Sequence, residues 1–168
     1  MNAWSCVIPG KPRTKNRKHA VWRPGMKHAR LIDHGPSKVA EENTRALMAM
    51  QKPAALFAGP VVQDVDFIFA IAESRRRDVK HRDGTVTKAL QPGDLHDGRP
   101  DRGNLLKLLD DAMKGIIVGD DAQMADGRVR KLWGDIDETR VTVRAWERES
   151  VSHPAQTGEV STTRDGAP

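Results

Sequence analysis

Strands are expected wherever apolar and polar residues alternate along the chain. The clearest such stretch covers residues 61–72, where one face is apolar and only Gln63 breaks the pattern. The apolar members of that face are Val61, Val65, Phe67, Phe69 and Ile71. Shorter stretches that predict further strands are 4–8, 21–22, 29–32, 129–133 and 139–146. The length of the 61–72 stretch indicates a central strand beneath a layer of helices.

Two other stretches carry apolar residues every three or four positions, which is the spacing of an amphipathic helix. The first is expected to begin at Pro36-Ser37, with Ser37 as its N-cap, and to run to about Gln51. Its predicted apolar stripe consists of Val39, Ala46, Leu47 and Met50. The second is expected to run from Asp101 to Lys114, ahead of a stop at Gly115. Its predicted buried side consists of Leu105, Leu108, Leu109 and Ala112.

The length of 168 residues is that of one ordinary domain, which we assign to residues 1–149. From 150 to 168 the chain is Ser, Thr, Gly and Pro with almost no apolar bulk, which predicts a disordered tail. The polar segment 73–99 is unusually long for a loop inside a compact domain. We expect it to be a DNA-facing or flexible insertion, with a small hairpin around Asp83-Gly84.

Charge favours a polyanionic partner. Lys and Arg number 28 against 23 Asp and Glu, so the formal charge is +5, which suits DNA, RNA or an anionic membrane surface. Many basic proteins nevertheless bind none of these. The residues expected to contact DNA lie in the loop after the first strand and at the start of the insertion: Lys11, Arg13, Lys15, Arg17, Lys18, Arg75, Arg76 and Arg77.

The single cysteine, Cys6, excludes an internal disulfide framework and a multi-thiolate zinc site. It lies in an apolar run and is expected to be a small core residue. A reducing cytoplasm is the natural compartment for such a chain. The N-terminus is too short and polar for a signal peptide, and no apolar run approaches the length of a membrane span, so no membrane partner is expected.

Four polar residues of the second helix are spaced three to four positions apart, and are therefore expected on one face, opposite the leucines. They are Asp101, Asn104, Lys107 and Asp111. Asp120-Asp121 follows after a short connection, so the chain can fold back and bring this pair toward the same face.

Carboxylates gathered in this way repel one another, and a hard divalent cation with oxygen ligands offsets that repulsion. Mg²⁺ needs only one or two protein carboxylates, because waters and a substrate phosphate complete its coordination shell. It can activate water for phosphodiester cleavage, and Lys107 would neutralise charge on the scissile phosphate. A structural alternative stays open, because helix caps and turns select the same residue types.

Three segments together resemble the signature of the RusA family of Holliday junction resolvases, which has the form P-D-x-D-N-L-x-K, then a D-A-L-like helix end, then D-D-x-Q. The segments are RPDRGNLLK at 99–107, LDDAM at 109–113 and GDDAQ at 119–123. The opening IPGKP at 8–12, with Asn16-Arg17 after it, also resembles that family. The resemblance extends from about Ala3 to Trp146 and leaves much of 73–99 uncovered.

The resemblance implies an α+β fold, with a small mixed or antiparallel sheet and two main helices packed on one face. It implies a homodimer that uses Mg²⁺ to resolve four-way junctions by paired nicks, in DNA recombination and repair. It implies that Asp101 and Asp121 are catalytic metal ligands, that Asp120 is an adjacent metal residue and that Lys107 assists catalysis. Such genes commonly lie in phages and prophages, so the cytoplasm of a bacterial or phage-infected cell is the expected location.

One position departs from the family pattern. Gly103 stands where the family has a second Asp, and glycine offers no ligand. Three explanations are open: another carboxylate (Asp120, Asp97 or Asp94) replaces the lost ligand, the change is an inactivating substitution made to trap DNA, or the protein is a natural binder with little nuclease activity. Glycine here also weakens the first helical turn by up to about 1 kcal/mol relative to alanine.

Three functions from different classes therefore remain. The first is a metal-dependent, structure-selective endonuclease, and the second is a catalytically weak or inactive junction-binding protein. The third is a basic domain whose partner is RNA or protein. The sequence offers few aromatic side chains on which the bases of a single-stranded nucleic acid could stack. Aromatic residues are 4%, Tyr is absent and the four Trp residues are scattered.

Overall fold

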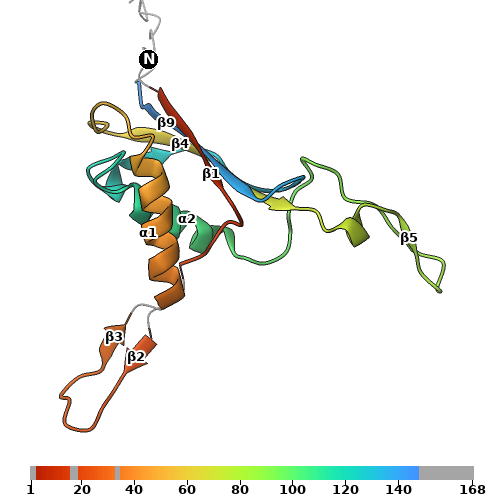
Figure 1. Cartoon of the computed structure of the whole chain (residues 1–168), viewed down its shortest axis with the longest axis horizontal. Helices are drawn as coiled ribbons and strands as arrows, with labels where there is room; N and C mark the ends of the chain where they lie inside the picture. Colours follow the sequence, from red (N-terminus) through yellow and green to blue (C-terminus); the bar gives the residue numbers. More distant parts are fainter. Residues whose placement is uncertain (1–2, 16–18, 33–34, 148–168) are drawn as a thin grey trace, which may run out of the picture.

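The computed structural model describes residues 3–15, 19–32 and 35–147, and these form a mixed sheet covered by two helices (Figure 1). The sheet has the order β1 (Ala3–Pro9), β9 (Glu138–Ala145), β4 (Val61–Ala70) and β7 (Met124–Asp126), while β8 (Val129–Gly134) also pairs with β4. Strand β4 is central, antiparallel to β9 and parallel to β7 and β8. The prediction of a long central strand at 61–72 is confirmed.

Helices α1 (Gly35–Ala49) and α2 (Arg102–Met113) lie side by side and pack on the same core. The inward face of β4 supplies the expected residues, because Val61, Val65, Phe67 and Phe69 are all buried there. Leu105 and Leu109 of α2 and Met48 of α1 close this core from the helix side. The predicted α+β class, with two helices and a small mixed sheet, is therefore confirmed.

The predicted apolar stripe of α1 is correct only at Leu47, which is partly buried against the core. Val39 and Met50 are 55% and 83% exposed, and Ala46 is exposed as well, whereas Met48 is completely buried. The helix begins at Gly35, so Ser37 lies buried in its first turn and does not cap it. The face that packs on the core follows the positions of Ser37 and Met48, which the polar residues between them hid from the sequence pattern.

Two hairpins project from the domain in different directions (Figure 1). One consists of β2 (His19–Val21) and β3 (Arg30–Ile32), and the other of β5 (Val79–Lys80) and β6 (Val86–Thr87). The hairpin around Asp83-Gly84 was predicted, and so were two short strands at 21–22 and 29–32, although Trp22 lies just beyond β2. The second hairpin and the 3₁₀ turn η1 (Glu73–Arg75) give structure to the long insertion. The predicted tail at 150–168 lies outside the described residues.

The segment after α2 contains elements that the sequence did not indicate. Gly115 has φ of +74°, which ends the helix as expected. A 3₁₀ turn, η2 (Asp121–Gln123), then leads directly into the short strand β7 beside β4. This return to the sheet is what carries Asp120 and Asp121 back toward α2.

Candidate active site

An acidic cavity of about 570 Å³ opens where α2, η2 and the start of β7 meet the sheet. Three carboxylates line it, and they come from three different elements: Asp110 from α2, Asp121 from η2 and Asp126 from β7. Its other lining residues are Gln63, Leu106, Ala122, Met124, Ala125, Gly127 and Val129. We call this space the acidic cavity.

Asp110 is the most shielded of these carboxylates. Its Oδ1 accepts a hydrogen bond of 3.0 Å from the side-chain amide of Gln63, the one polar residue on the inward face of β4. Burial raises the pKa of Asp110, the Gln63 hydrogen bond partly counters this, and the charges of Asp111 and Asp121 raise it further. A cation bound in the cavity would lower the pKa of Asp110 again, because a nearby positive charge favours the ionised carboxylate.

Gly127 allows the floor of the cavity to approach β4 closely. Its φ is +140°, and a Cβ atom at this position would lie 1.8 Å from the carbonyl oxygen of Gln63. No side chain other than hydrogen fits there. The close approach lets the chain pass from β7 to β8 while both strands pair with β4.

Gln123 fixes the η2 turn that presents Asp121. Its side-chain oxygen accepts from the backbone N–H groups of Gly119 and Asp120, at 2.7 and 2.9 Å. Its amide donates to the carbonyl oxygens of Phe57 and Gly59, at 3.0 and 2.8 Å. The last residue of the D-D-x-Q segment therefore has a structural role, because its side chain joins the turn to the segment that precedes β4. We call this set of hydrogen bonds the Gln123 clasp.

Asp120 already has partners for both of its carboxylate oxygens. Oδ1 accepts from the backbone N–H of Ala122 at 3.0 Å, and Oδ2 pairs with the Lys114 ammonium at 2.5 Å. These contacts, with a further one to Asp121, lower the pKa of Asp120 to about 2. Lys114 also lies 3.5 Å from Asp121, and its own pKa is raised by the two carboxylates. Asp120 thus caps η2 and has its own charge balanced by Lys114, while Asp121 lines the cavity.

Asp101 occupies the N-cap position of α2, where its side chain is exposed and accepts from Asn104 at 3.4 Å. The described residues that line the acidic cavity do not include it. Asp110 follows Asp101 by nine positions, which is about 13 Å along a helix axis. The structure therefore places Asp121 and Asp110 in the same cavity, and Asp101 at the other end of α2.

The segment that precedes Asp101 is hydrogen-bonded to a side chain of β8. The ammonium of Lys131 donates to the carbonyl oxygens of Gly98 and Pro100, the latter at 2.8 Å. His96 is buried between the rings of Phe69 and Trp133, at centroid distances of 4.5 and 4.1 Å. These contacts fix the chain that enters α2, and burial lowers the pKa of the His96 imidazole.

Helical spacing places Gly103, Lys107 and Asp110 on one face of α2. Lys107 is exposed on this face, between the position of the missing Asp and the cavity. Gly103 has open space around it, since nothing described lies within 4 Å of a Cβ atom built there. The face therefore has room for a side chain where the family has its second Asp.

Asp111 does not share the surroundings of Asp110. Its carboxylate contacts the Lys15 ammonium, which also pairs with Glu41 of α1 at 3.1 Å. The backbone N–H of Lys15 donates to the carbonyl of Asn104 at 2.9 Å. Lys15, predicted as a DNA contact, thus also joins the basic loop to both helices.

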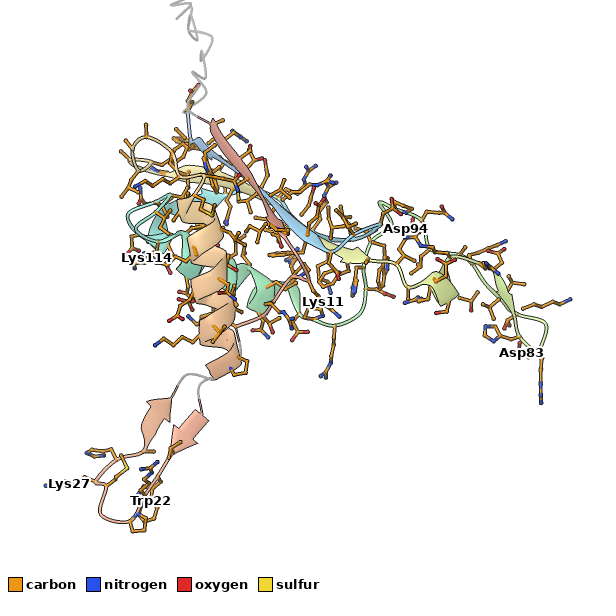
Figure 2. All side chains as sticks on the ribbon, viewed as in Figure 1. Lys11, Trp22, Lys27, Asp83, Asp94 and Lys114 are labelled. Atoms are coloured by element: carbon orange, nitrogen blue, oxygen red, sulfur yellow. The ribbon has the colours of Figure 1, made fainter. Side chains whose placement is uncertain are left out.

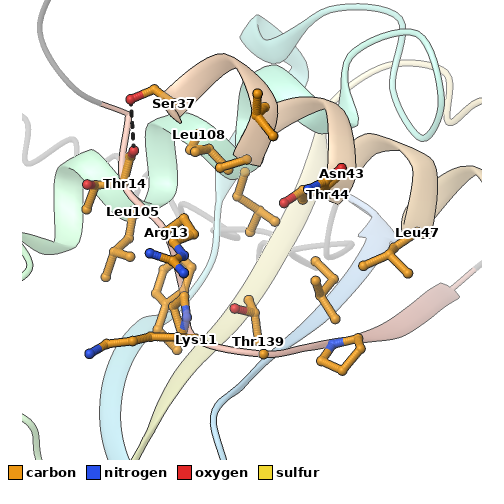
Figure 3. A pocket seen from close by; sticks show the side chains of 18 of the residues that line it. Lys11, Arg13, Thr14, Ser37, Asn43, Thr44, Leu47, Leu105, Leu108 and Thr139 are labelled. Atoms are coloured by element: carbon orange, nitrogen blue, oxygen red, sulfur yellow. Dashed lines mark hydrogen bonds between the residues drawn. The ribbon is translucent and has the colours of Figure 1, made fainter. Parts of the chain in front are cut away.

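Among the described residues, the other predicted DNA contacts fall in two places. Lys11 and Arg13 line a second cavity of about 690 Å³, between α1, α2 and the end of β1 (Figure 3). None of the residues that line the acidic cavity lines this one. Arg75 lies over the Trp133 ring at 5.2 Å, Arg76 pairs with Asp135 at 3.0 Å, and Arg77 is exposed. Arg17 and Lys18 lie outside the described residues.

Sequence reasoning missed Asp110, Asp126 and Gln63. Asp110 follows Lys107 by three positions, so it has the same helical spacing that singled out Asp111, and only the fold distinguishes the two. Gln63 stood out as the polar exception in an apolar strand. Asp126 gave no signal, because β7 was not predicted.

Comparison with known proteins decides the family. The model of the family "Endodeoxyribonuclease RusA" matches residues 9–144, which is most of the chain. The chain belongs to the RusA family. It is also 25% identical over 144 residues to the uncharacterised protein YqaN of Bacillus subtilis (strain 168), covering 86% of this chain and 97% of that protein. RusA membership implies Holliday junction endonuclease activity in general, on branched DNA and with a divalent metal. Neither described helix is long and apolar enough to cross a membrane.

Proposed function

We propose that this RusA protein is a Mg²⁺-dependent endonuclease that resolves four-way DNA junctions by paired nicks in recombination and repair. The observation that carries the proposal is the acidic cavity, in which Asp121 of the family signature meets the half-buried carboxylate of Asp110. Basic residues such as Lys11, Arg13 and Arg77 are proposed to make the phosphate contacts that such a substrate needs.

The donor set of the cavity fits a Mg²⁺ ion that keeps several waters. Such an ion takes one or two protein carboxylates, which Asp121 and Asp110 offer. Among the described residues, no group of three or more His, Cys, Asp or Glu side chains is arranged to hold a metal ion, so waters and a substrate phosphate would have to complete the coordination shell. Asp120 contacts the carboxylate of Asp121 and so acts on the ion through that residue. Asp101, about 13 Å along α2 from Asp110, is too far away to bind the same ion as Asp110, so the metal role that the family signature implies for Asp101 is a separate expectation from this cavity. We propose Asp110 as the carboxylate that compensates for Gly103.

A bound metal would supply a Lewis acid and an activated water for phosphodiester hydrolysis. The chain's own residues prepare the site for that chemistry. Asp121 is held by the Gln123 clasp, and Asp110 is oriented by Gln63. Lys107, exposed on the same face of α2, is placed to stabilise charge that develops on the scissile phosphate.

The test is nicking of a synthetic four-way junction against a linear duplex, with and without Mg²⁺. The protein should nick the junction only with metal, and Asp121→Asn should lower the rate by at least about 100-fold while junction binding in EDTA is retained. Glu42→Gln, which removes an exposed carboxylate of α1 that pairs only at the surface with Lys38, is the matched control and should nick normally. Failure of the pure protein to nick at any Mg²⁺ or Mn²⁺ concentration would refute the enzyme.

A catalytically weak junction-binding protein is the second candidate, and Gly103 is the observation that favours it. Open space at this position means that Gly103→Asp should fold normally. If the wild-type protein binds junctions without nicking and Gly103→Asp nicks them, the protein is a binder on a nuclease scaffold. If Gly103→Asp leaves an inactive protein inactive, loss of that ligand does not explain the inactivity.

We further propose a homodimer that acts in the cytoplasm of a bacterial or phage-infected cell. A four-way junction is close to two-fold symmetric, so a C2 dimer presents one acidic cavity to each of two opposed strands. Sedimentation of the protein alone and with junction would measure this. A monomer in both states would contradict paired nicking by a preformed dimer.

A further inference from the structure

The hairpin formed by residues 19–32, which we call the basic hairpin, ends in an exposed tryptophan. Figure 1 shows it projecting beyond the start of α1. Its turn is closed by a hydrogen bond of 3.0 Å from the Met26 N–H to the Arg23 carbonyl, with Gly25 at φ of +92°. Trp22 and Lys27 lie at the outer end of the hairpin (Figure 2). This hydrogen-bonded turn therefore lies, with the indole ring, away from the body of the domain.

Trp22 is 63% exposed, which distinguishes it from the tryptophans that contribute to packing. Trp4 is 8% exposed in the core, and Trp133 stacks on His96. An indole ring in water loses the favourable burial of a large apolar surface. The exposed ring is therefore available to a flat, apolar partner.

The residues near Trp22 in the sequence are cationic, and this charge indicates which class of partner the ring would contact. The sequence of the basic hairpin contains Arg23, Lys27 and Arg30 and no Asp or Glu. The β5–β6 hairpin differs, because there Lys88 pairs with Asp78 at 2.8 Å. A segment whose sequence carries cations and no carboxylate, and whose aromatic ring is exposed, matches a partner that combines phosphates with stacking bases.

We propose that Trp22 stacks on a base that opens at the branch point of junction DNA, while Arg23 and Lys27 hold the adjacent phosphates. The inference rests on the proposed function in one respect, since it takes branched DNA as the substrate. It gives the basic hairpin a role in recognising the branch that the carboxylate site does not provide. A linear duplex offers no unstacked base, so Trp22 should contribute little to binding it.

The test measures the affinity of the wild-type protein and its variants for a labelled four-way junction and a matched linear duplex, in EDTA so that no cleavage occurs. Trp22→Ala should weaken junction binding by about 5- to 100-fold, the range for loss of one base–aromatic stack, and duplex binding by less than about threefold. Trp22→Phe should restore most of the affinity. Trp146→Ala is the matched control, because Trp146 is also exposed, at 47%, but follows the end of β9.

Tryptophan fluorescence gives a second measurement. Junction binding should quench emission of the wild-type protein, and this quenching should be largely lost in Trp22→Phe although that variant still binds. Equal losses on junction and duplex in Trp22→Ala would overturn the proposal, as would no loss on either. A change from dimer to monomer in Trp22→Ala would also overturn it, by showing a contact between copies.

These outcomes are separable from the fate of the endonuclease proposal. A protein that binds junctions through Trp22 but never nicks them would support the stacking role and refute the enzyme. A protein that nicks junctions with unchanged rate and affinity in Trp22→Ala would refute the stacking role alone. Absence of any binding to branched DNA would refute both.

Discussion

At the scale of single residues, neighbouring carboxylates of α2 have different surroundings. Asp110 and Asp111 are adjacent in sequence, yet Asp110 lies in the acidic cavity and Asp111 contacts Lys15 beside α1. Asp110 has a raised pKa because burial disfavours its charge. A carboxylate kept in such a place at a cost to stability is typical of a functional site.

Asp110→Asn tests this directly. Asparagine keeps the hydrogen bond from Gln63 and removes the charge, so the melting temperature at neutral pH should stay level or rise by a few degrees. The sign follows from the raised pKa, because the folded state binds the proton more tightly than the unfolded state and loses stability as pH rises through the folded pKa. Nicking should fall by at least about tenfold if Asp110 assists the metal.

The matched variant for Asp110→Asn is Asp111→Asn, which breaks the contact with Lys15. That variant should lower the melting temperature, because Lys15 and Glu41 lose a partner in a half-buried ion cluster. Thermal melts and nicking rates of the two variants separate the roles. A drop in stability without loss of nicking in Asp110→Asn would assign that residue a structural role instead.

At the scale of an element, η2 depends on charge as well as on the Gln123 clasp. Asp120 accepts from the Ala122 N–H at the start of this turn and pairs with Lys114, the residue that follows α2. Its pKa of about 2 is below the unfolded value of about 3.9. The stabilisation is therefore fully present above the unfolded pKa and is lost as pH falls through about 2.

Asp120→Asn should therefore reduce the acid sensitivity of the protein. The urea midpoint of the wild-type chain should fall between pH 5 and pH 2 by more than that of Asp120→Asn, and 1 M salt should narrow the difference, because the ion pair is exposed to solvent. Midpoints measured in EDTA keep metal binding out of the comparison. Parallel pH profiles for the two proteins would show that Asp120 does not stabilise the turn.

At the scale of the whole molecule, the core and the two hairpins have separate tasks. The core lies between the sheet and the two helices, while both hairpins project from it (Figure 1). The insertion is closed at its base by the Leu90 N–H, which donates to the Arg75 carbonyl at 2.9 Å. The residues between Arg75 and Leu90 extend the charged surface away from the domain and do not contribute to the core.

Replacement of residues 77–88 by a short Gly-Ser turn should leave the fold intact. The melting temperature should change by no more than about 2 °C, because Val79 and Val86 are exposed and the base of the insertion is kept. DNA affinity should fall, and the slope of log affinity against log salt should decrease by about two to four, since four cations and two carboxylates are removed. Salt titrations with junction and duplex would check both, and an unchanged slope would exclude this hairpin from phosphate contact.

The sequence alone determined the strands β1, β4, β8 and β9, the helix α2, the hairpin around Asp83-Gly84 and the RusA signature, because periodicity and turn residues are local properties. Only the tertiary structure decided which face of α1 is buried, since the burial of Met48 and the exposure of Met50 depend on how that helix meets α2 and the sheet. The same holds for the site. The pairing of Asp121 with Asp110 rather than Asp101 follows from the return of the chain through η2 and β7 to strand β4, a long-range pairing that no local pattern encodes.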